Sequence, residues 1–331
     1  MDSAEREGLR PKGNVPNLRF PEFQGEWDKC KFRDVCSIST GNKNTQDKID
    51  DGIYPFYVRS QTVERINSWT FDGEAILTAG DGVGVGKVFH HTYGKIGVHQ
   101  RVYILSDFKC DANYLFHFFS SKFYNRVKRM SAKNSVDSVR KEMITDMPLS
   151  LPSHQEQVKI GYLLSLLDER IATQNKIIDK LQSLIKGISS RIFASIQGIE
   201  YRMGDIVTIT NGNSNVQDAV TESKDGLYPF FDRSEDIKYL PTFLFDKEAI
   251  IYPGEGTEFM PRYFKGKFAL HQRCYAIFDF NEIINTCFLY FYLKTRNSYF
   301  VKNAVGSTVP SLRLDTFQKL KVIIPPKKNT T

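Results

Sequence analysis

The chain has 331 residues, of which 41% are hydrophobic and 25% charged, and it carries a formal net charge of +7 at pH 7. This length suits two domains rather than one, and the composition is that of a globular protein with sizeable cores. No apolar run approaches the roughly 18 residues of a membrane span, and the charged N-terminal residues lack the apolar stretch of a secretory signal. Five cysteines without C-x-x-C spacing favour reduced thiols in a cytoplasm over a disulfide framework or zinc ribbon.

In chain order, the first predicted segments are a tail at 1–14 and a domain at 15–152 whose sequence returns later in the chain. In each copy an aromatic-rich stretch of helical composition is followed by a serine-containing loop and an apolar strand that ends in proline. This whole-domain duplication predicts two globular domains of mixed α/β (α+β) class. The repeated blocks are DGIYPFYVRS (51–60) with DGLYPFFDRS (225–234), FDGEAILTAGDG (71–82) with FDKEAIIYPGEG (245–256), and HQRVYIL (99–105) with HQRCYAIF (271–278).

A glycine-rich stretch, AGDGVGVGKV at 79–88, could bring backbone N–H groups close to an anion. Its spacing matches neither the P-loop nor G-x-G-x-x-G in any reading frame. The second copy reads PGEGTEFMPRYF and keeps only Gly254 and Gly256 of these glycines. We therefore predict a tight turn at 80–82 followed by an exposed loop, with no nucleotide site and no cofactor.

The segment at 153–198 is predicted to be one long helix. Ser153 and Glu156 form a capping box at its start, and Gly198 suits its end. Apolar residues recur with the 3.5-residue period of a coiled coil, so the helix, roughly 60 Å long, requires a partner helix to cover its seam. Gln174 in mid-seam either fixes the register or is simply tolerated. The seam comprises Ile160, Leu164, Leu167, Ile171, Gln174, Ile178, Leu181, Ile185, Ile188 and Ile192.

The second domain is predicted at 199–326, before a tail at 327–331, and both domains carry side chains suited to DNA. Arginine can bind guanine and glutamine can bind adenine through paired hydrogen bonds, whereas lysine suits phosphates. The His-Gln-Arg motif occurs in both copies, so it is either scaffold or a phosphate contact, with scaffold favoured. The candidate DNA-binding residues are Arg59, Ser60, Gln61, Lys87, Gln100, Arg101, Lys122, Arg126, Lys128, Arg129, Lys133, Ser135, Arg140, Arg233, Ser234, Arg262, Gln272, Arg273, Lys294, Arg296, Lys302, Ser307 and Arg313.

The choice of sequence should depend on residues that differ between the copies. Tyr57 against Phe231 is expected to be a difference within the core. The segment from Lys122 to Lys141 has seven basic residues and one acid, and we favour a phosphate-binding surface there over a solvated helix face. The differing residues are Asp81, Val83, Lys87, His90 and His91 in the first copy, and Glu255, Thr257, Glu258 and Arg262 in the second.

Signals of catalysis are weak. The only Pro-Pro pair, Pro325-Pro326, is followed by Lys327 rather than by the aromatic residue of an amino-methyltransferase loop. The triplet from Asp236 to Lys238 matches a nuclease motif by letters only. The six histidines have no metal-binding spacing. We expect a non-catalytic protein without a metal.

This layout resembles the specificity (S) subunits of type I restriction-modification systems. The resemblance covers about residues 15–326 and rests on VPNLRFPEF with Trp27, on the paired glycine-turn and HQR blocks, and above all on the helix that begins LPSHQEQVKIGYLL. It implies two target-recognition domains that bind a bipartite double-stranded DNA target and a central conserved helix that docks modification (M) subunits, with restriction (R) subunits joining through them. It also implies no catalytic centre, no cofactor, and a location in a bacterial or archaeal cytoplasm.

Members of this family have a second conserved helix after the second domain, whereas this sequence stops at VIIPPKKNTT. We therefore expect a chain without that helix, whose exposed seam drives either self-association or binding of modification subunits. One alternative is an inactive truncated S-subunit cassette. Another is a non-catalytic coiled-coil adaptor, which would differ from a DNA reader because its binding would not weaken steeply with salt.

Overall fold

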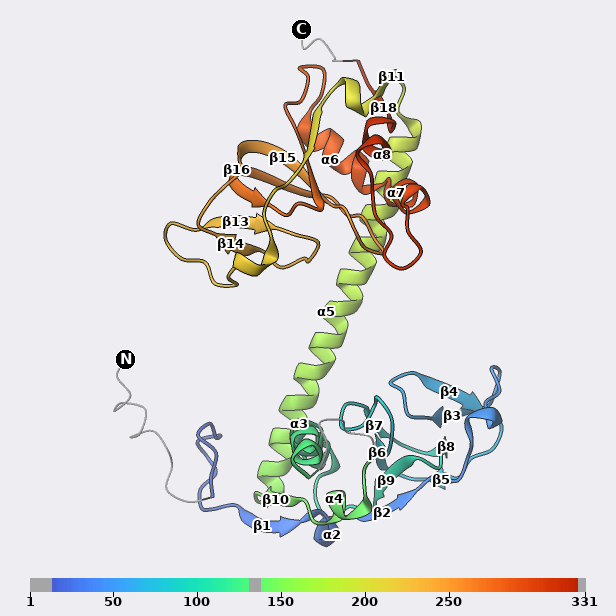
Figure 1. Ribbon diagram of the computed structural model, residues 1–331. Coiled ribbons are helices and arrows are strands. Elements are labelled where there is room, and N and C mark those ends of the chain that lie inside the picture. Colours follow the sequence, from blue (N-terminus) through green and yellow to red (C-terminus); the bar gives the residue numbers. More distant parts are fainter. Residues whose placement is uncertain (1–13, 131–137, 327–331) are drawn as a thin grey trace. The chain divides into compact units, whose positions relative to one another are not determined.

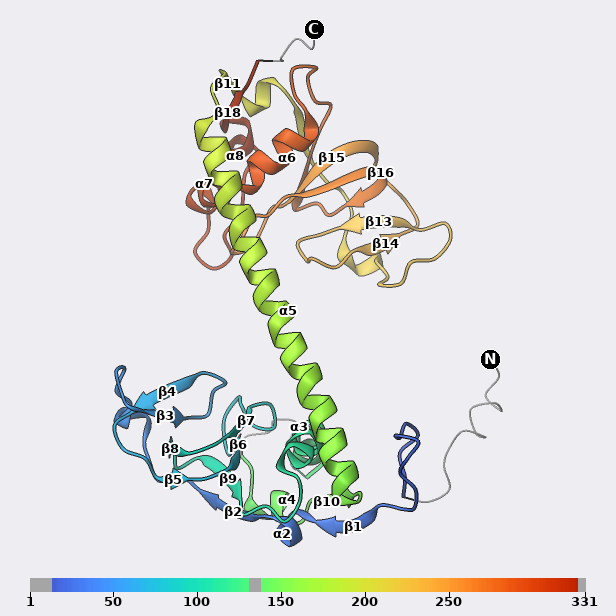
Figure 2. The ribbon, with the colours of Figure 1, turned by 180° about the vertical axis from the view of Figure 1, so that it is seen from behind.

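The computed structural model describes residues 14–130 and 138–326, and the chain divides into two compact units within the long helix α5 (His154–Ser195), between Asn175 and Lys176. Each unit combines β-sheets with helices (Figures 1 and 2). The predicted mixed α/β class and the long central helix are therefore confirmed. None of the helices in the described ranges is both long and apolar enough to cross a membrane.

Among its described residues, unit 1 forms one sheet of order β2-β9-β6-β7 and another of order β4-β3-β8-β5. Strands β1 and β10 pair with each other on the side of the unit away from β3 and β4 (Figures 1 and 2). The elements are β1 (Asp28–Lys31), α2 (Phe32–Val35), β2 (Ser37–Thr40), β3 (Tyr54–Tyr57), β4 (Val63–Ile66), β5 (Phe71–Asp72), β6 (Ala75–Ala79), β7 (Phe89–Thr92), β8 (Lys95–Val98), β9 (Val102–Ser106), α3 (Ala112–Met130), α4 (Lys141–Thr145) and β10 (Pro148–Leu151).

The core of unit 1 is organised by α3. Every fourth residue of this helix from Leu115 to Val127 is apolar and fully buried, including Phe119 and Phe123. This stripe packs against β7, where the Phe89 ring contacts both phenylalanines edge to face. Full burial of one such side chain contributes about 1.5–3 kcal/mol, so the aromatic stretch seen in the sequence is a core helix on this face.

Unit 2 repeats the arrangement in one sheet of order β12-β17-β15-β16-β13-β14, counted over its described residues. The registers correspond: Leu77 on β6 lies opposite His90 on β7, and Ile251 on β15 lies opposite Arg262 on β16. The elements are β11 (Ile199–Arg202), β12 (Thr208–Asn211), β13 (Tyr228–Phe231), β14 (Lys238–Leu240), β15 (Phe245–Pro253), β16 (Arg262–Leu270), β17 (Cys274–Phe278), α6 (Thr286–Lys294), α7 (Asn297–Asn303), α8 (Leu314–Gln318) and β18 (Lys321–Ile324).

The start of α5 is attached to unit 1 through buried polar groups. The Ser153 hydroxyl accepts a hydrogen bond from the Glu156 N–H at 3.4 Å. The fully buried Glu156 carboxylate instead accepts two 2.7 Å bonds from the Arg19 guanidinium. The predicted reciprocal capping box is therefore wrong in its second half, because a bidentate arginine 137 residues away in the sequence binds this carboxylate.

The seam of α5 is largely exposed beyond its first turns. Ile160 packs against the core of unit 1, but the seam residues from Leu167 onward, apart from Gln174, are 48–59% exposed. In unit 2, Phe193 near the end of α5 packs against Phe288 and Tyr292. A Cβ on Gly198 would overlap the Ile324 carbonyl, so this glycine permits close strand pairing rather than ending the helix.

Replacement of two glycines of α5 by alanine should change the free energy of unfolding in opposite directions. A Cβ on Gly161 would lie 2.7 Å from Asp111 Oδ1 and 2.8 Å from the Tyr114 nitrogen, whereas a Cβ on Gly187 meets nothing within 4 Å. We expect Gly161→Ala to lower the free energy of unfolding by about 1–3 kcal/mol. Gly187→Ala should raise it by about 0.5–1 kcal/mol. Denaturation followed by circular dichroism measures both, and a Gly161→Ala protein as stable as Gly187→Ala would disprove this close contact.

Candidate nucleic-acid interface

Both units have a shallow hollow at the same place in the repeat. The two hollows correspond in register, with Arg59 equivalent to Arg233 and Asp81 equivalent to Glu255. The unit 1 hollow is lined by Thr45, Val58, Arg59, Ser60, Asp81, Gly82, Val83 and Gly84. The unit 2 hollow is lined by Val216, Asp232, Arg233, Glu255, His271, Gln272, Arg273 and Cys274.

In unit 1 the His-Gln-Arg turn joins the segments around the hollow through backbone hydrogen bonds. The His99 N–H donates to the Tyr57 carbonyl at 3.0 Å, and the Gly80 N–H donates to the Arg101 carbonyl at 2.7 Å. A Cβ on Gly41 would overlap the Val98 carbonyl. These close approaches hold the ends of β3, β6 and β9 together, so the glycines serve the packing of backbones.

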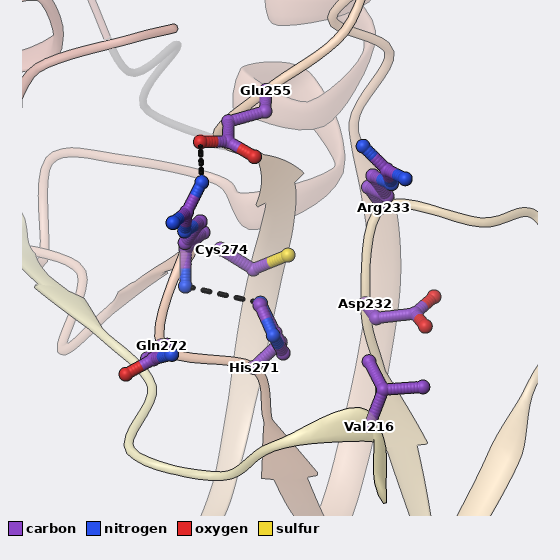
Figure 3. Close-up of a pocket in the computed structure, with 8 residues that line it drawn as sticks. Val216, Asp232, Arg233, Glu255, His271, Gln272 and Cys274 are labelled. Carbon is purple, nitrogen blue, oxygen red and sulfur yellow. Dashed lines mark hydrogen bonds and ion pairs between the residues drawn. The ribbon is translucent and has the colours of Figure 1, made fainter.

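Unit 2 reproduces the same turn. The His271 N–H donates to the Phe231 carbonyl at 2.9 Å, and a Cβ on Gly212 would overlap the Leu270 carbonyl. Figure 3 shows Val216, Asp232 and Arg233 on one side of the hollow, Gln272 and His271 on the other, and Glu255 at one end.

The histidine and glutamine of the motif are bound to the protein itself. His99 Nδ1 accepts from the Arg101 N–H at 3.0 Å, and the Gln100 amide donates to Asn44 Oδ1 at 2.6 Å. In unit 2 His271 Nδ1 and Gln272 make the same two contacts, the latter with Asn215 at 2.9 Å. Burial lowers the pKa of both histidines. This geometry supports the scaffold interpretation for two of the three motif residues.

Two arginines of unit 1 and one of unit 2 are exposed and held by a carboxylate that lines the hollow. Asp81 contacts Arg59 at 2.9 Å and Arg101 at 3.7 Å, and Glu255 contacts Arg273 at 2.5 Å. Arg101 and Arg273 are 65% and 62% exposed. Asp81 and Glu255 were expected among the residues that differ between copies, but the structure gives them the same contact. An acid between two glycines in both copies was the sequence signal for this pairing.

His90 links the loop after β3 to β7, and Arg262 links the loop after β13 to β16. His90 packs edge to face on the Tyr57 ring and contacts the Ser60 carbonyl at 3.2 Å. At the corresponding place in unit 2, Arg262 lies over the Phe231 ring and donates to the Asp232 carbonyl. Arg262 is therefore engaged within the protein. Tyr57 and Phe231 are buried, as expected for core residues.

Several other predicted residues also have partners inside their unit. His91, expected to help select sequence, instead contacts Glu74 at 2.9 Å and stacks on Phe116. The Ser60 hydroxyl donates to the Thr62 carbonyl, and that of Ser234 donates to Asp232. Gln61, Val83, Thr257 and Glu258 are exposed.

The loop after Gly82 is exposed at Val83 and Lys87 and buried between them. Val83 is 98% exposed, but Val85 is 2% exposed and belongs to the core, so the predicted exposed loop is wrong beyond its first residues. Gly86 has a φ of 66° and lies against Tyr124 of α3. Exposed Lys87 lies 5.5 Å from the centre of the same ring. This contact places the glycine loop beside α3.

The basic half of α3 accordingly adjoins the hollow of unit 1. Lys122, Lys128 and Arg129 are exposed. Arg126 is half-buried and its Nε donates to the Met143 carbonyl at 2.7 Å, which ties α3 to α4. Arg140, just before α4, is exposed. The candidates Lys133 and Ser135 lie outside the described residues.

Of the weaker candidates of unit 2, some lie against aromatic rings and others are exposed. Lys294 lies 5.4 Å from the Tyr290 ring, and the Arg296 guanidinium lies 4.2 Å from the Tyr292 ring. Lys302, Ser307 and Arg313 are exposed, and Arg313 precedes α8 as Arg140 precedes α4. Among the described residues, no group of three or more His, Cys, Asp or Glu side chains could hold a metal ion.

Comparisons with known proteins show the family of the chain. The family model of the type I restriction modification DNA specificity domain matches residues 24–183 and 199–330. Over 161 residues the chain is 26% identical to the type I restriction enzyme EcoDI specificity subunit of Escherichia coli, which covers 49% of this chain and 35% of that protein. Over 190 residues it is 28% identical to the MjaVIII specificity subunit of Methanocaldococcus jannaschii, which covers 53% and 43%. The matches thus span less than half the length of these relatives.

A solved structure has a similar fold. The crystal structure of the type I restriction-modification S subunit from M. genitalium matches with a TM-score of 0.67, covering 93% of this chain and 87% of that one. Sequence identity is 17%, so this similarity concerns the fold.

The neutral histidines of the two turns predict acid sensitivity. Because burial lowers the pKa of His99 and His271 in the folded state, the unfolded chain binds protons first as the pH falls. Stability should be complete above the ordinary histidine pKa of about 6.5 and decrease below it. We expect His99→Gln with His271→Gln to flatten the dependence of the unfolding midpoint on pH, and His154→Gln, at the exposed start of α5, to leave it unchanged. Equal pH dependence in all three proteins would contradict this role.

Proposed function

The chain belongs to the specificity-subunit family of type I restriction-modification systems, and on this premise we propose that each unit binds one half of a bipartite DNA target. The observation that carries the proposal is the duplicated hollow, whose lining acid contacts an exposed arginine at the same position of the His-Gln-Arg turn in each unit. The planar guanidinium can donate two hydrogen bonds to guanine in the major groove.

The residues around the hollow support separate roles for different side chains, some in contact with bases and others in contact with phosphates. Residues on rigid strand ends, Arg101 and Arg273, are suited to base edges because their backbone is fixed on both sides. The exposed lysines and arginine on α3 are suited to phosphates, which position a protein on DNA without reading its sequence. Val83, Thr257 and Glu258 are exposed at the turns and differ between units, so they can distinguish the two half-sites.

The apolar seam of α5 supports the second part of the proposal, the docking of modification subunits. Seven exposed apolar side chains along one helix face are costly in water, and a partner helix would remove them from it. Restriction subunits would join through the modification subunits, in the cytoplasm, and methylation and cleavage would belong to those partners. The same seam is the observation that favours the alternatives of self-association or of a non-catalytic adaptor.

Replacing the turn arginines tests the DNA half of the proposal. We expect Arg101→Ala to weaken preference in one half of a split motif selected from random duplexes, and Arg273→Ala in the other half, each by about 1–3 kcal/mol. Sequencing of the bound pool and titration with salt measure this. Lys29→Ala is the control, since this exposed lysine lies on β1, on the side away from β3 (Figure 2). Unchanged affinity for every duplex would remove these arginines from the interface.

Charges in the seam test its role in assembly. We expect Leu167→Asp with Ile178→Asp to abolish binding of the modification subunit or self-association, because burial of an unpaired carboxylate in an apolar interface is prohibitive. Ala172→Asp with Ser183→Asp adds the same charge to the opposite side of the helix and should assemble normally. Native mass spectrometry of each protein, alone and with the modification subunit, gives the stoichiometry. Normal assembly of the seam variant would show that another surface forms the interface.

A further inference from the structure

In both units a single carboxylate that lines the hollow is less exposed than the arginines that it contacts. Asp81 is 24% exposed and Glu255 is 17% exposed, whereas their arginine partners are 46–65% exposed. The carboxylates are therefore mostly covered, whereas the guanidinium groups are about half exposed or more. The acid stands between two glycines of the turn in each copy, at equivalent positions of the repeat.

The backbone of each acid is fixed by its unit. Asp81 forms an isolated bridge with Ser138, and Glu255 forms the equivalent bridge with Ser311. The neighbouring Gly80 carbonyl accepts from the Val139 N–H at 2.7 Å, and that of Gly254 accepts from the Leu312 N–H at 2.8 Å. Each carboxylate is thus a fixed anchor on a rigid turn, and it limits the positions that its arginine can occupy.

An acid on a DNA-binding surface has two opposing effects. It repels phosphates and offsets part of the arginine charge, which weakens binding to DNA of any sequence. It also holds the guanidinium in one arrangement, so less side-chain entropy is lost when that group binds a base. Together these effects lower affinity for DNA in general and raise the preference for one sequence.

We propose that Asp81 and Glu255 are specificity-determining positioning residues, which hold arginines for base contact and suppress binding to non-target DNA. The inference rests on the proposed function of the two units. The two acids differ in reach: in unit 1 one aspartate holds both Arg59 and Arg101, whereas in unit 2 the longer glutamate holds Arg273. Arg233, the counterpart of Arg59, makes no ion pair within the described part of unit 2.

This asymmetry sets the size of the expected effects. Asp81→Asn releases two arginines, so the slope of log affinity against log salt for a mixed-sequence non-target duplex should steepen by up to about two. Glu255→Gln releases one, and the slope should steepen by about one. Affinity for the same duplex at low salt should rise severalfold in both variants, with the larger rise in Asp81→Asn.

The test uses the full chain with its modification subunit, a randomised duplex pool with sequencing, and the non-target duplex in a salt series. We expect Asp81→Asn to reduce the sequence preference of one half of the selected motif by about tenfold, within the range of one arginine–guanine contact, and Glu255→Gln to do so in the other half. Glu200→Gln is the matched control, because it removes one exposed carboxylate, paired with Lys321, on β11. Circular dichroism and the unfolding midpoint check that each variant is folded.

Two results would overturn the inference while leaving the proposed function intact. If the parent protein enriches a split motif and both variants enrich the same motif with the same salt slope, the carboxylates do not determine specificity. If a folded variant loses affinity for all duplexes without a change of slope, the acid is only structural. If the parent protein enriches no motif at all, the proposed function fails, and the inference fails with it.

Discussion

The close approach of backbones at the His-Gln-Arg turn is the constraint on which the binding surface of each unit depends. A side chain at Gly41 or Gly212 would overlap the carbonyl at the end of β8 or β16. The N–H of the motif histidine donates to the carbonyl at the end of β3 or β13. Because these bonds fix main-chain atoms, they are independent of the side chains that face outward. Two units can therefore keep one scaffold and present different residues from it.

The helix α5 differs, because its two ends pack against the units whereas the apolar face of its middle is exposed to solvent. Its first turns are held by Glu156, Gln157 and Gly161, all buried against unit 1, and Phe193 near its end packs into unit 2. Between these anchors, the apolar seam residues from Leu167 to Ile192 are 48–59% exposed. A helix that is stable at both ends and apolar along one face is well suited to receive a partner helix.

The partners of the arginines explain why the net charge of the chain does not predict how much positive charge is available at the hollows. The total of +7 is modest for 331 residues. Arg59, Arg101 and Arg273 have carboxylate neighbours, and Arg126 and Arg262 bond to carbonyl groups. Among the described residues, the exposed cations without a carboxylate partner include Lys122 and Lys128 on α3 and Arg233 after β13. Under the proposed function, recognition would depend on where a few guanidinium groups are held, and less on the overall field.

The sequence by itself determined the duplication, the mixed α/β class, the long helix with its seam, and the location of the turns, because each depends on residue types at short, regular spacing. It also provided the candidate DNA-binding residues. Only the tertiary structure decided which of them remain open. Arg19 reaches Glu156, Arg126 reaches Met143, His91 reaches Glu74, and Val85 is buried rather than exposed. These contacts form between residues that only the fold brings together, so the spacing of residues in the sequence does not predict them.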